Sequence, residues 1–131
     1  MLAVTPVSKR LLIIADDNVA MRWLVRSTVG TSGMEVVEAG DGRALLWHLL
    51  RCSFTHDERD VTVITDMCMP VYSGLDVILA CQELGYHPRT IVITAYPSAE
   101  LSARIAETGA QLVAKPFATG TLRDMVDHAR R

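Results

Sequence analysis

The chain has 131 residues, of which 50% are hydrophobic and 21% are charged. This length predicts a single domain, and the apolar content suffices for a buried core, which excludes intrinsic disorder and low-complexity character. The 13 Lys and Arg residues against 15 Asp and Glu residues give a formal net charge of −2. Because no broad basic face is available, we expect no direct binding of nucleic acid by this chain.

Cysteine usage and apolar runs indicate the cellular compartment. The chain has three cysteines, Cys52, Cys68 and Cys81. Their odd number and wide spacing argue against a disulfide framework, and the absence of a C-x-x-C pair argues against a zinc site. The early apolar run at residues 11–15 is too short for a signal-peptide core. No stretch approaches the roughly 18 apolar residues of a membrane span. We therefore expect a cytoplasmic protein without a membrane segment.

The first half of the chain predicts two strands and two helices in alternation. Residues 11–15 form a continuous apolar run, which is typical of a buried parallel strand. A helix capped by Asn18 follows, and residues 34–38 form a more polar strand that suits a sheet edge. Asp41 can cap a second helix, followed by a polar loop at residues 52–60. The residues expected on the inward faces are Met21, Leu24, Val25 and Thr28 in the first helix, and Leu45, Leu46, Leu49 and Leu50 in the second.

The second half repeats this alternation. Strands are predicted at residues 61–65, 90–94 and 111–114. A helix is predicted at residues 98–108, and two further helices follow the third and fifth strands. Those two helices are marked by Leu75, Ile78 and Leu79, ending at Gly85, and by Leu122, Met125, Val126 and Ala129.

This alternation of strands and helices predicts the fold class. It requires right-handed crossovers and a parallel sheet covered on both faces, which is a three-layer α/β sandwich. We expect residues 9–131 to form one domain, preceded by a short N-terminal extension at residues 1–8.

Charged and hydroxyl side chains gather at the carboxyl ends of the predicted strands, where open parallel sheets place their functional residues. Asp16 and Asp17 follow the first strand, and Asp66 follows the third. Thr94 ends the fourth strand, and Lys115 follows the fifth. Crowded carboxylates repel one another unless a cation joins them, and oxygen ligands favour Mg²⁺ or Mn²⁺ over zinc. Since the lysine supplies a positive charge for an anion, the pattern predicts phosphoryl chemistry at an acidic magnesium site.

Taken in this order, these residues resemble the receiver domain of the bacterial two-component response regulators. The resemblance runs from about Lys9 to the end of the chain. It implies a flavodoxin-like (βα)₅ fold with five parallel strands in the order 2-1-3-4-5. The residues that carry it are Asp16 and Asp17 after LLIIA, Asp66 in the stretch DMCMPVYSG, Thr94 with Ala95, and Lys115 with Pro116 and Phe117.

The resemblance implies a self-catalysed phosphoryl transfer, and not an enzyme that acts on other molecules. Asp66 would accept a phosphoryl group from the phosphohistidine of a sensor histidine kinase or histidine phosphotransfer protein, or from a small phosphodonor. Mg²⁺ would be held by Asp17, Asp66 and the backbone carbonyl of Cys68, with Asp16 acting largely through a bound water. The metal would neutralise charge that develops on the phosphoryl oxygens.

The resemblance also implies a conformational switch. Lys115 would pair with the phosphoryl group, and the hydroxyl of Thr94 would bond one of its oxygens, which draws the Thr94 loop inward. The peptide bond between Lys115 and Pro116 would be cis. Leu112 stands where the family usually has Tyr or Phe, so we expect signalling through the fourth-helix face to be weaker or differently coupled.

Several alternatives stay open at this point. A pseudo-receiver, which acts as an interaction module without phosphorylation, is the main rival function, although the complete set of acidic, hydroxyl and lysine residues argues against it. Nucleotide-binding modules are disfavoured because neither GxxxxGK[ST] nor GxGxxG occurs. The sequence does not distinguish a stand-alone regulator, a phosphorelay intermediate and a receiver attached to an output domain, and it leaves a homodimer possible. Asp41 and Asp76 lie near helix starts, where a capping role suffices.

Overall fold

A computed structural model describes residues 9–118 and 120–128. Five strands and five helices alternate within this part of the chain, as the sequence predicted. The expected extension at residues 1–8 and the expected inward position of Ala129 lie outside the described residues. The elements are β1 (Arg10–Ala15), α1 (Val19–Val29), β2 (Glu35–Ala39), α2 (Gly42–Phe54), β3 (Asp60–Asp66), α3 (Gly74–Glu83), β4 (Arg89–Thr94), α4 (Ala99–Glu107), β5 (Gln111–Ala114) and α5 (Thr121–His128).

The strands form one parallel sheet in the order β2-β1-β3-β4-β5, which is the flavodoxin-like order expected from the sequence. β1 therefore has β2 on one side and β3 on the other, and the strand order reverses at this point. The connections that leave the two strands β1 and β3 diverge toward opposite faces, and such a reversal leaves a crevice at the carboxyl edge of the sheet.

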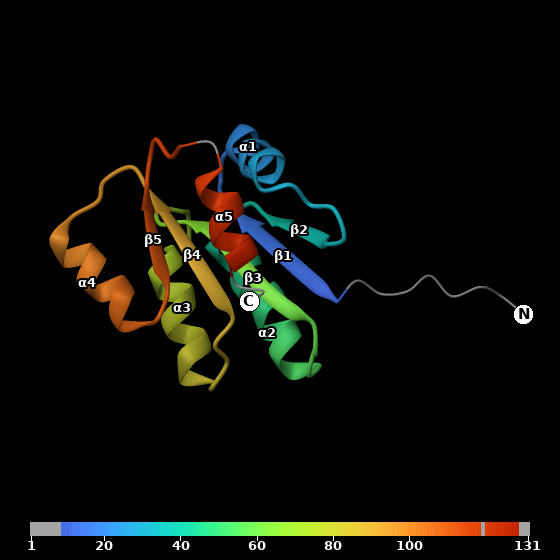
Figure 1. The fold of residues 1–131 in the computed structure, drawn as a ribbon. Coiled ribbons are helices and arrows are strands. Elements are labelled where there is room, and N and C mark those ends of the chain that lie inside the picture. The colour runs from blue at the N-terminus through green and yellow to red at the C-terminus, as the bar shows by residue number, and fades with distance from the viewer. Residues whose placement is uncertain (1–8, 119, 129–131) are drawn as a thin grey trace, which may run out of the picture.

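Helices cover both faces of the sheet. α1 and α5 pack on one face, and α2, α3 and α4 pack on the other (Figure 1). Alternate residues of β1 enter different layers, since Leu12 and Ile14 meet α1 and α5 while Leu11 and Ile13 meet α2 and α3. Burial on both faces is the reason that the central strands are continuous apolar runs. No helix among the described residues has the length and apolar character needed to cross a membrane.

The inward face of α1 differs from the prediction, and α3 exposes one of the apolar residues that marked it. In α1, Leu24 is 42% exposed, Thr28 is only half-buried, and Val25 and Val29 are buried. In α3, Leu79 is 43% exposed. Each helix presents a narrow stripe to the flat sheet, so residues on the flanks of a wide apolar arc remain in contact with solvent.

The polar loop predicted at residues 52–60 begins later in the structure, because α2 continues to Phe54. Cys52 is buried and extends the inward stripe of Leu45 and Leu49 by one more turn. Thr55 then ends the helix, and its hydroxyl donates to the carbonyl of Arg51 at 2.7 Å. The polar composition of residues 52–60 did not predict this last helical turn, because a cysteine packs as a small apolar side chain.

Two glycines allow α2 and α3 to begin close to the loop that follows β3. A Cβ at Gly42 would lie 2.0 Å from the carbonyl oxygen of Tyr72, and a Cβ at Gly74 would lie 2.9 Å from that of Asp66. The amide of Gly42 also donates to the carbonyl of Pro70 at 3.2 Å. The loop between β3 and α3 is therefore held against both helices by contacts that a larger residue would prevent.

One residue of this loop has an unfavourable backbone conformation. Val71 has a φ of 73° although it is β-branched, and its side chain is 62% exposed, so it gains little from packing. We predict that Val71→Asn raises the free energy of unfolding by about 1 kcal/mol, because asparagine tolerates the left-handed region. Urea denaturation measures this change. Val19→Asn, at a similarly exposed valine with ordinary backbone geometry, is the control, and an unchanged or lower stability of Val71→Asn would contradict the prediction.

Candidate functional site

Three carboxylates meet at the carboxyl ends of β1 and β3. Asp16 and Asp17 follow β1 directly, and Asp66 is the last residue of β3. These strands are neighbours with Ala15 opposite Thr65, so the chain leaves both strands at the same level. One carboxylate oxygen from each aspartate lies within 4.8 Å of the others. This oxygen cluster fits a hard divalent cation such as Mg²⁺.

Asp16 is the most enclosed member of the cluster, with 5% exposure. Its carboxylate accepts a hydrogen bond from the amide of Asn18 at 2.9 Å. Burial raises the pKa of Asp16, and the negative charges of Asp66 and Asp17 raise it further, against the opposing effects of the Asn18 amide and Lys115. When no cation is bound, the buried negative charge at Asp16 therefore lowers the stability of the folded chain at neutral pH.

Lys115 supplies the positive charge within the site. Its Nζ lies 2.9 Å from Oδ1 of Asp66. Burial opposes the ammonium charge, but the hydrogen bond and the charge of Asp66 outweigh this effect and, with Asp16 and Asp17, raise the pKa of Lys115. Lys115 is therefore protonated at neutral pH. The peptide bond from Lys115 to Pro116 is cis, as the family resemblance implied.

Thr94 shares this edge of the sheet. Its side chain is buried, its hydroxyl oxygen accepts the amide of Tyr96 at 3.1 Å, and its carbonyl accepts the amide of Lys115 at 2.8 Å. Thr94 is thus joined to the lysine through the backbone. The side chain of Tyr96 is 81% exposed.

Cys68 and Leu112 lie at different depths. Cys68 is exposed on the loop that follows Asp66. Leu112 is half-buried and packs against the apolar cluster between α3, β4 and α4. It therefore lies in the core contact of α4 and not among the charged groups.

The loop after Asp66 is anchored through its backbone. The amide of Met67 donates to the carbonyl of Ile93 at 2.8 Å, and the amide of Gly74 donates to the carbonyl of Met67 at 2.9 Å. The hydroxyl of Thr65 donates to the carbonyl of Asp66 at 2.9 Å. Because β4, α3 and β3 each hold this loop, the carboxylate of Asp66 has a fixed position relative to the neighbouring strand ends.

Arg22 of α1 is a contributor that sequence reasoning missed. It donates to the backbone carbonyl of Asp16 at 2.6 Å and pairs with Glu38 of β2 at 3.1 Å. Arg26, one turn further, also reaches Glu38, at 3.3 Å. The arginine thus fixes the chain at the acidic pair and adds a positive charge beside it. The available signal was an arginine one turn into the helix that begins after Asp17.

The raised pKa of Asp16 predicts a pH-dependent stability in the absence of divalent cations. Below the ordinary aspartate pKa the folded and unfolded chains both hold this proton, so Asp16 carries no charge penalty there. As the pH rises from the ordinary pKa through the higher folded pKa, the unfolded chain releases the proton first, and the free energy of unfolding falls. We therefore predict that Asp16→Asn is more stable than the parent chain at neutral pH without Mg²⁺, and that the difference disappears toward pH 3.

Thermal denaturation between pH 3 and pH 8 in a chelating buffer measures this difference. The control is Asp41→Asn, which keeps the cap that Asp41 provides to the amide of Ala44. An Asp16→Asn variant that is less stable than the parent chain at neutral pH, or a difference independent of pH, would contradict the assignment of a charge penalty to Asp16.

Comparisons with known proteins agree with this geometry. Residues 12–127 match the model of the response regulator receiver domain. The chain is 32% identical over 127 residues to the response regulator protein PilR of Pseudomonas aeruginosa, covering 95% of this chain but 27% of that protein. It is 27% identical over 116 residues to sporulation initiation phosphotransferase F of Bacillus subtilis, covering 88% of this chain and 89% of that protein. The chain thus spans about a quarter of one relative and most of the other.

Solved structures show the same fold. The chemotaxis protein CheY4 of Vibrio cholerae is 26% identical with a TM-score of 0.73, over 91% of this chain and 97% of that chain. The signal receiver domain of a putative Luxo repressor protein from Vibrio parahaemolyticus reaches a TM-score of 0.79 at 20% identity, over 90% and 87% of the two chains. With the matched family model and an acidic cluster beside a lysine at the carboxyl edge of a 2-1-3-4-5 sheet, the chain belongs to the response regulator receiver domains of two-component signalling.

Proposed function

We propose that this receiver domain accepts a phosphoryl group on Asp66 in a Mg²⁺-dependent reaction and changes conformation in response. The observation that carries the proposal is the position of the Asp66 carboxylate. One of its oxygens lies within 4.8 Å of an oxygen of each of two further carboxylates, and the ammonium group of Lys115 is 2.9 Å away. Asp17 is exposed, so this part of the site is open to solvent and to a phosphodonor.

The donor set of the site fits Mg²⁺. Asp17, Asp66 and the backbone carbonyl of Cys68 would hold the ion, and Asp16 would act through a bound water. When bound, the ion supplies positive charge that offsets the charge on the phosphoryl oxygens. The carboxylate oxygens available in the cluster are the ligands that Mg²⁺ prefers, with Mn²⁺ as a possible substitute.

In the transfer itself, Asp66 is the nucleophile. A carboxylate oxygen of Asp66 attacks phosphorus, and a new P–O bond forms as the bond to the donor breaks and its electrons leave with the donor. In a phosphohistidine this is a P–N bond, and in acetyl phosphate it is a P–O bond. Lys115 is then free to pair with a phosphoryl oxygen in place of the Asp66 carboxylate. Hydrolysis of the acyl phosphate by water returns Asp66 to its starting state.

The reaction is self-catalysed, so we infer that the domain is a signalling component and not an enzyme with an external substrate. A sensor histidine kinase or a histidine phosphotransfer protein would supply the phosphoryl group, in the cytoplasm. The relative named a DNA-binding transcriptional regulator, NtrC of Azospirillum brasilense, is matched over 24% of its length, which suggests control of an output domain or of a separate target protein. A homodimer is a further possible output.

Acetyl phosphate with and without Mg²⁺, followed by intact mass spectrometry, tests this function. We predict a phosphoryl mass increment that requires Mg²⁺ and is absent in Asp66→Asn. Asp76→Asn is the matched control, because Asp76 belongs to the cap of α3, where it accepts the amide of Ser73 at 3.0 Å. No increment in a folded parent chain would favour a pseudo-receiver, and an undiminished increment in Asp66→Asn would place the acceptor elsewhere.

The switch is tested separately at Thr94. Its hydroxyl is buried at the edge of the site and holds the amide of Tyr96, so a bond to the phosphoryl group would displace that loop. We predict that Thr94→Val still accepts the phosphoryl group but loses most of the phosphorylation-dependent amide shifts at residues 94–97 in ¹H–¹⁵N NMR spectra. Thr94→Ser, which keeps the hydroxyl, should retain them. Equal responses in both variants would exclude the hydroxyl as the coupling group.

A further inference from the structure

The outer face of α2 carries four exposed side chains in one narrow stripe. Arg43, Trp47, Arg51 and Phe54 are spaced at i, i+4, i+8 and i+11, which places them within an arc of about 80° on a helix. Trp47 is 57% exposed and Phe54 is 70% exposed, and both arginines are exposed as well. We refer to these four residues as the α2 stripe.

This stripe lies opposite the face that α2 uses for the fold. Leu45, Leu49 and Cys52 already fill the contact with the sheet, so the aromatic rings of the stripe are not needed for the core. Large exposed aromatic side chains that form a continuous surface are typical of protein interfaces. Trp and Arg are also the residue types that most often contribute the binding energy of such interfaces.

The charge of the stripe has one sign. α2 contains no aspartate or glutamate, and no ion pair among the described residues includes Arg43 or Arg51. The guanidinium carbon of Arg51 lies over the Trp47 ring, 5.6 Å from its centre, so the cation is already positioned at the aromatic surface. A carboxylate that approaches from solvent can therefore meet a positioned arginine beside an apolar ring.

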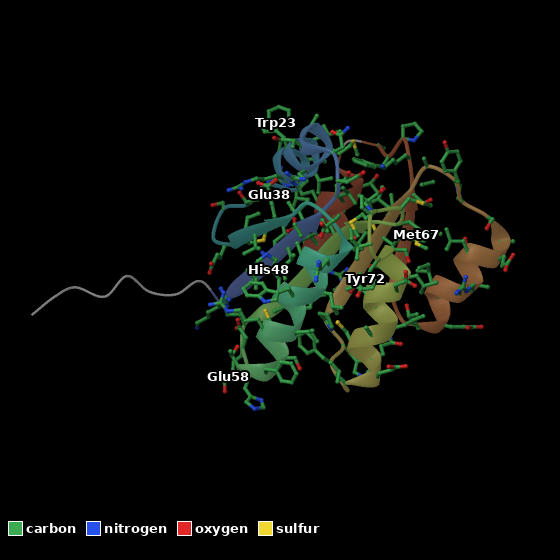
Figure 2. The ribbon with its side chains drawn as sticks, turned by 180° about the vertical axis from the view of Figure 1, so that it is seen from behind. Trp23, Glu38, His48, Glu58, Met67 and Tyr72 are labelled. Carbon is green, nitrogen blue, oxygen red and sulfur yellow. The ribbon has the colours of Figure 1, made fainter. Side chains whose placement is uncertain are left out.

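A groove of mixed polar and apolar lining lies next to the stripe. It has a volume of about 390 Å³ and lies between α2 and the edge strand β2, with Arg51 and His48 at its rim. Figure 2 shows His48 on the part of α2 that lies beside β1 and β2. Its apolar lining is the half-buried Val37 above the buried Leu11 and Ile13. Its polar lining includes Glu35 and Asp57, and both carboxylates are already paired with Arg59, so the arginines of the stripe are the cations left for a partner.

We propose that the α2 stripe and this groove form a docking surface for a protein segment that carries carboxylate and apolar side chains. A second copy of the chain is disfavoured because a symmetric contact through α2 would bring arginines of both copies together. Nucleic acid is disfavoured because two arginines on a domain of net charge −2 release few counterions. The surface is distinct from the acidic site, so the proposal does not depend on phosphorylation of Asp66.

The probe for this surface is a fluorescein-labelled synthetic helical peptide with glutamate and leucine on one face, titrated with the full chain and followed by fluorescence anisotropy. We expect Arg51→Glu and Trp47→Ala each to raise the Kd by about tenfold. Trp23→Ala is the matched control, since Trp23 is 68% exposed on α1, which packs on the other face of the sheet from α2 (Figures 1 and 2). A peptide with glutamine in place of each glutamate should bind at least about tenfold more weakly.

Several outcomes would overturn the proposal. These are no binding of the glutamate peptide, equal affinity for the glutamine peptide, or an equal loss of affinity in Trp23→Ala. Tighter binding of single-stranded DNA or of anionic lipid vesicles through Arg51 and Trp47 would assign the surface to another class of partner. Circular dichroism of each variant confirms that a lost affinity is not a lost fold, and Arg51→Glu should still accept a phosphoryl group from acetyl phosphate.

Discussion

The repulsion among three crowded carboxylates is the constraint on which the rest of the site depends. Two unit charges about 5 Å apart near a protein surface repel by roughly 3 kcal/mol. Asp16, Asp17 and Asp66 are held at this separation by two neighbouring strands, and among the described residues only Lys115 forms an ion pair with one of them, at 2.9 Å. The arrangement is therefore stabilised by any ligand that adds positive charge at the cluster.

The surrounding fold prevents the carboxylates from moving apart. Arg22 holds the backbone at Asp16, and Thr65 and Gly74 hold the backbone on either side of Asp66. The loop after β3 also contacts α2, because Gly42 allows the start of that helix to lie against the carbonyl of Tyr72. The loop after Asp66 therefore contacts the first turns of both α2 and α3.

The main residues of the acidic site could be predicted from the sequence, because residues that follow parallel strands lie at the same edge of the sheet. Once residues 11–15 and 61–65 are recognised as parallel strands, Asp16 and Asp66 must meet at one edge. The same logic fails for Arg22, because its contact depends on how α1 turns after Asp17. It also fails for Leu24 and Cys52, since apolar character does not specify which side of an arc packs on the sheet or where a helix ends. The left-handed conformation of Val71 has no sequence signal, because valine rarely adopts it.

The central claim is that Asp66, and not another carboxylate of the cluster, accepts the phosphoryl group. Treatment of the acetyl phosphate-modified chain with borohydride reduces an aspartyl phosphate to homoserine, and tandem mass spectrometry of the peptides then locates the reduced residue. We predict homoserine at position 66 only, and only when Mg²⁺ was present during the reaction. Homoserine at position 16 or 17, or its formation without Mg²⁺, would contradict it.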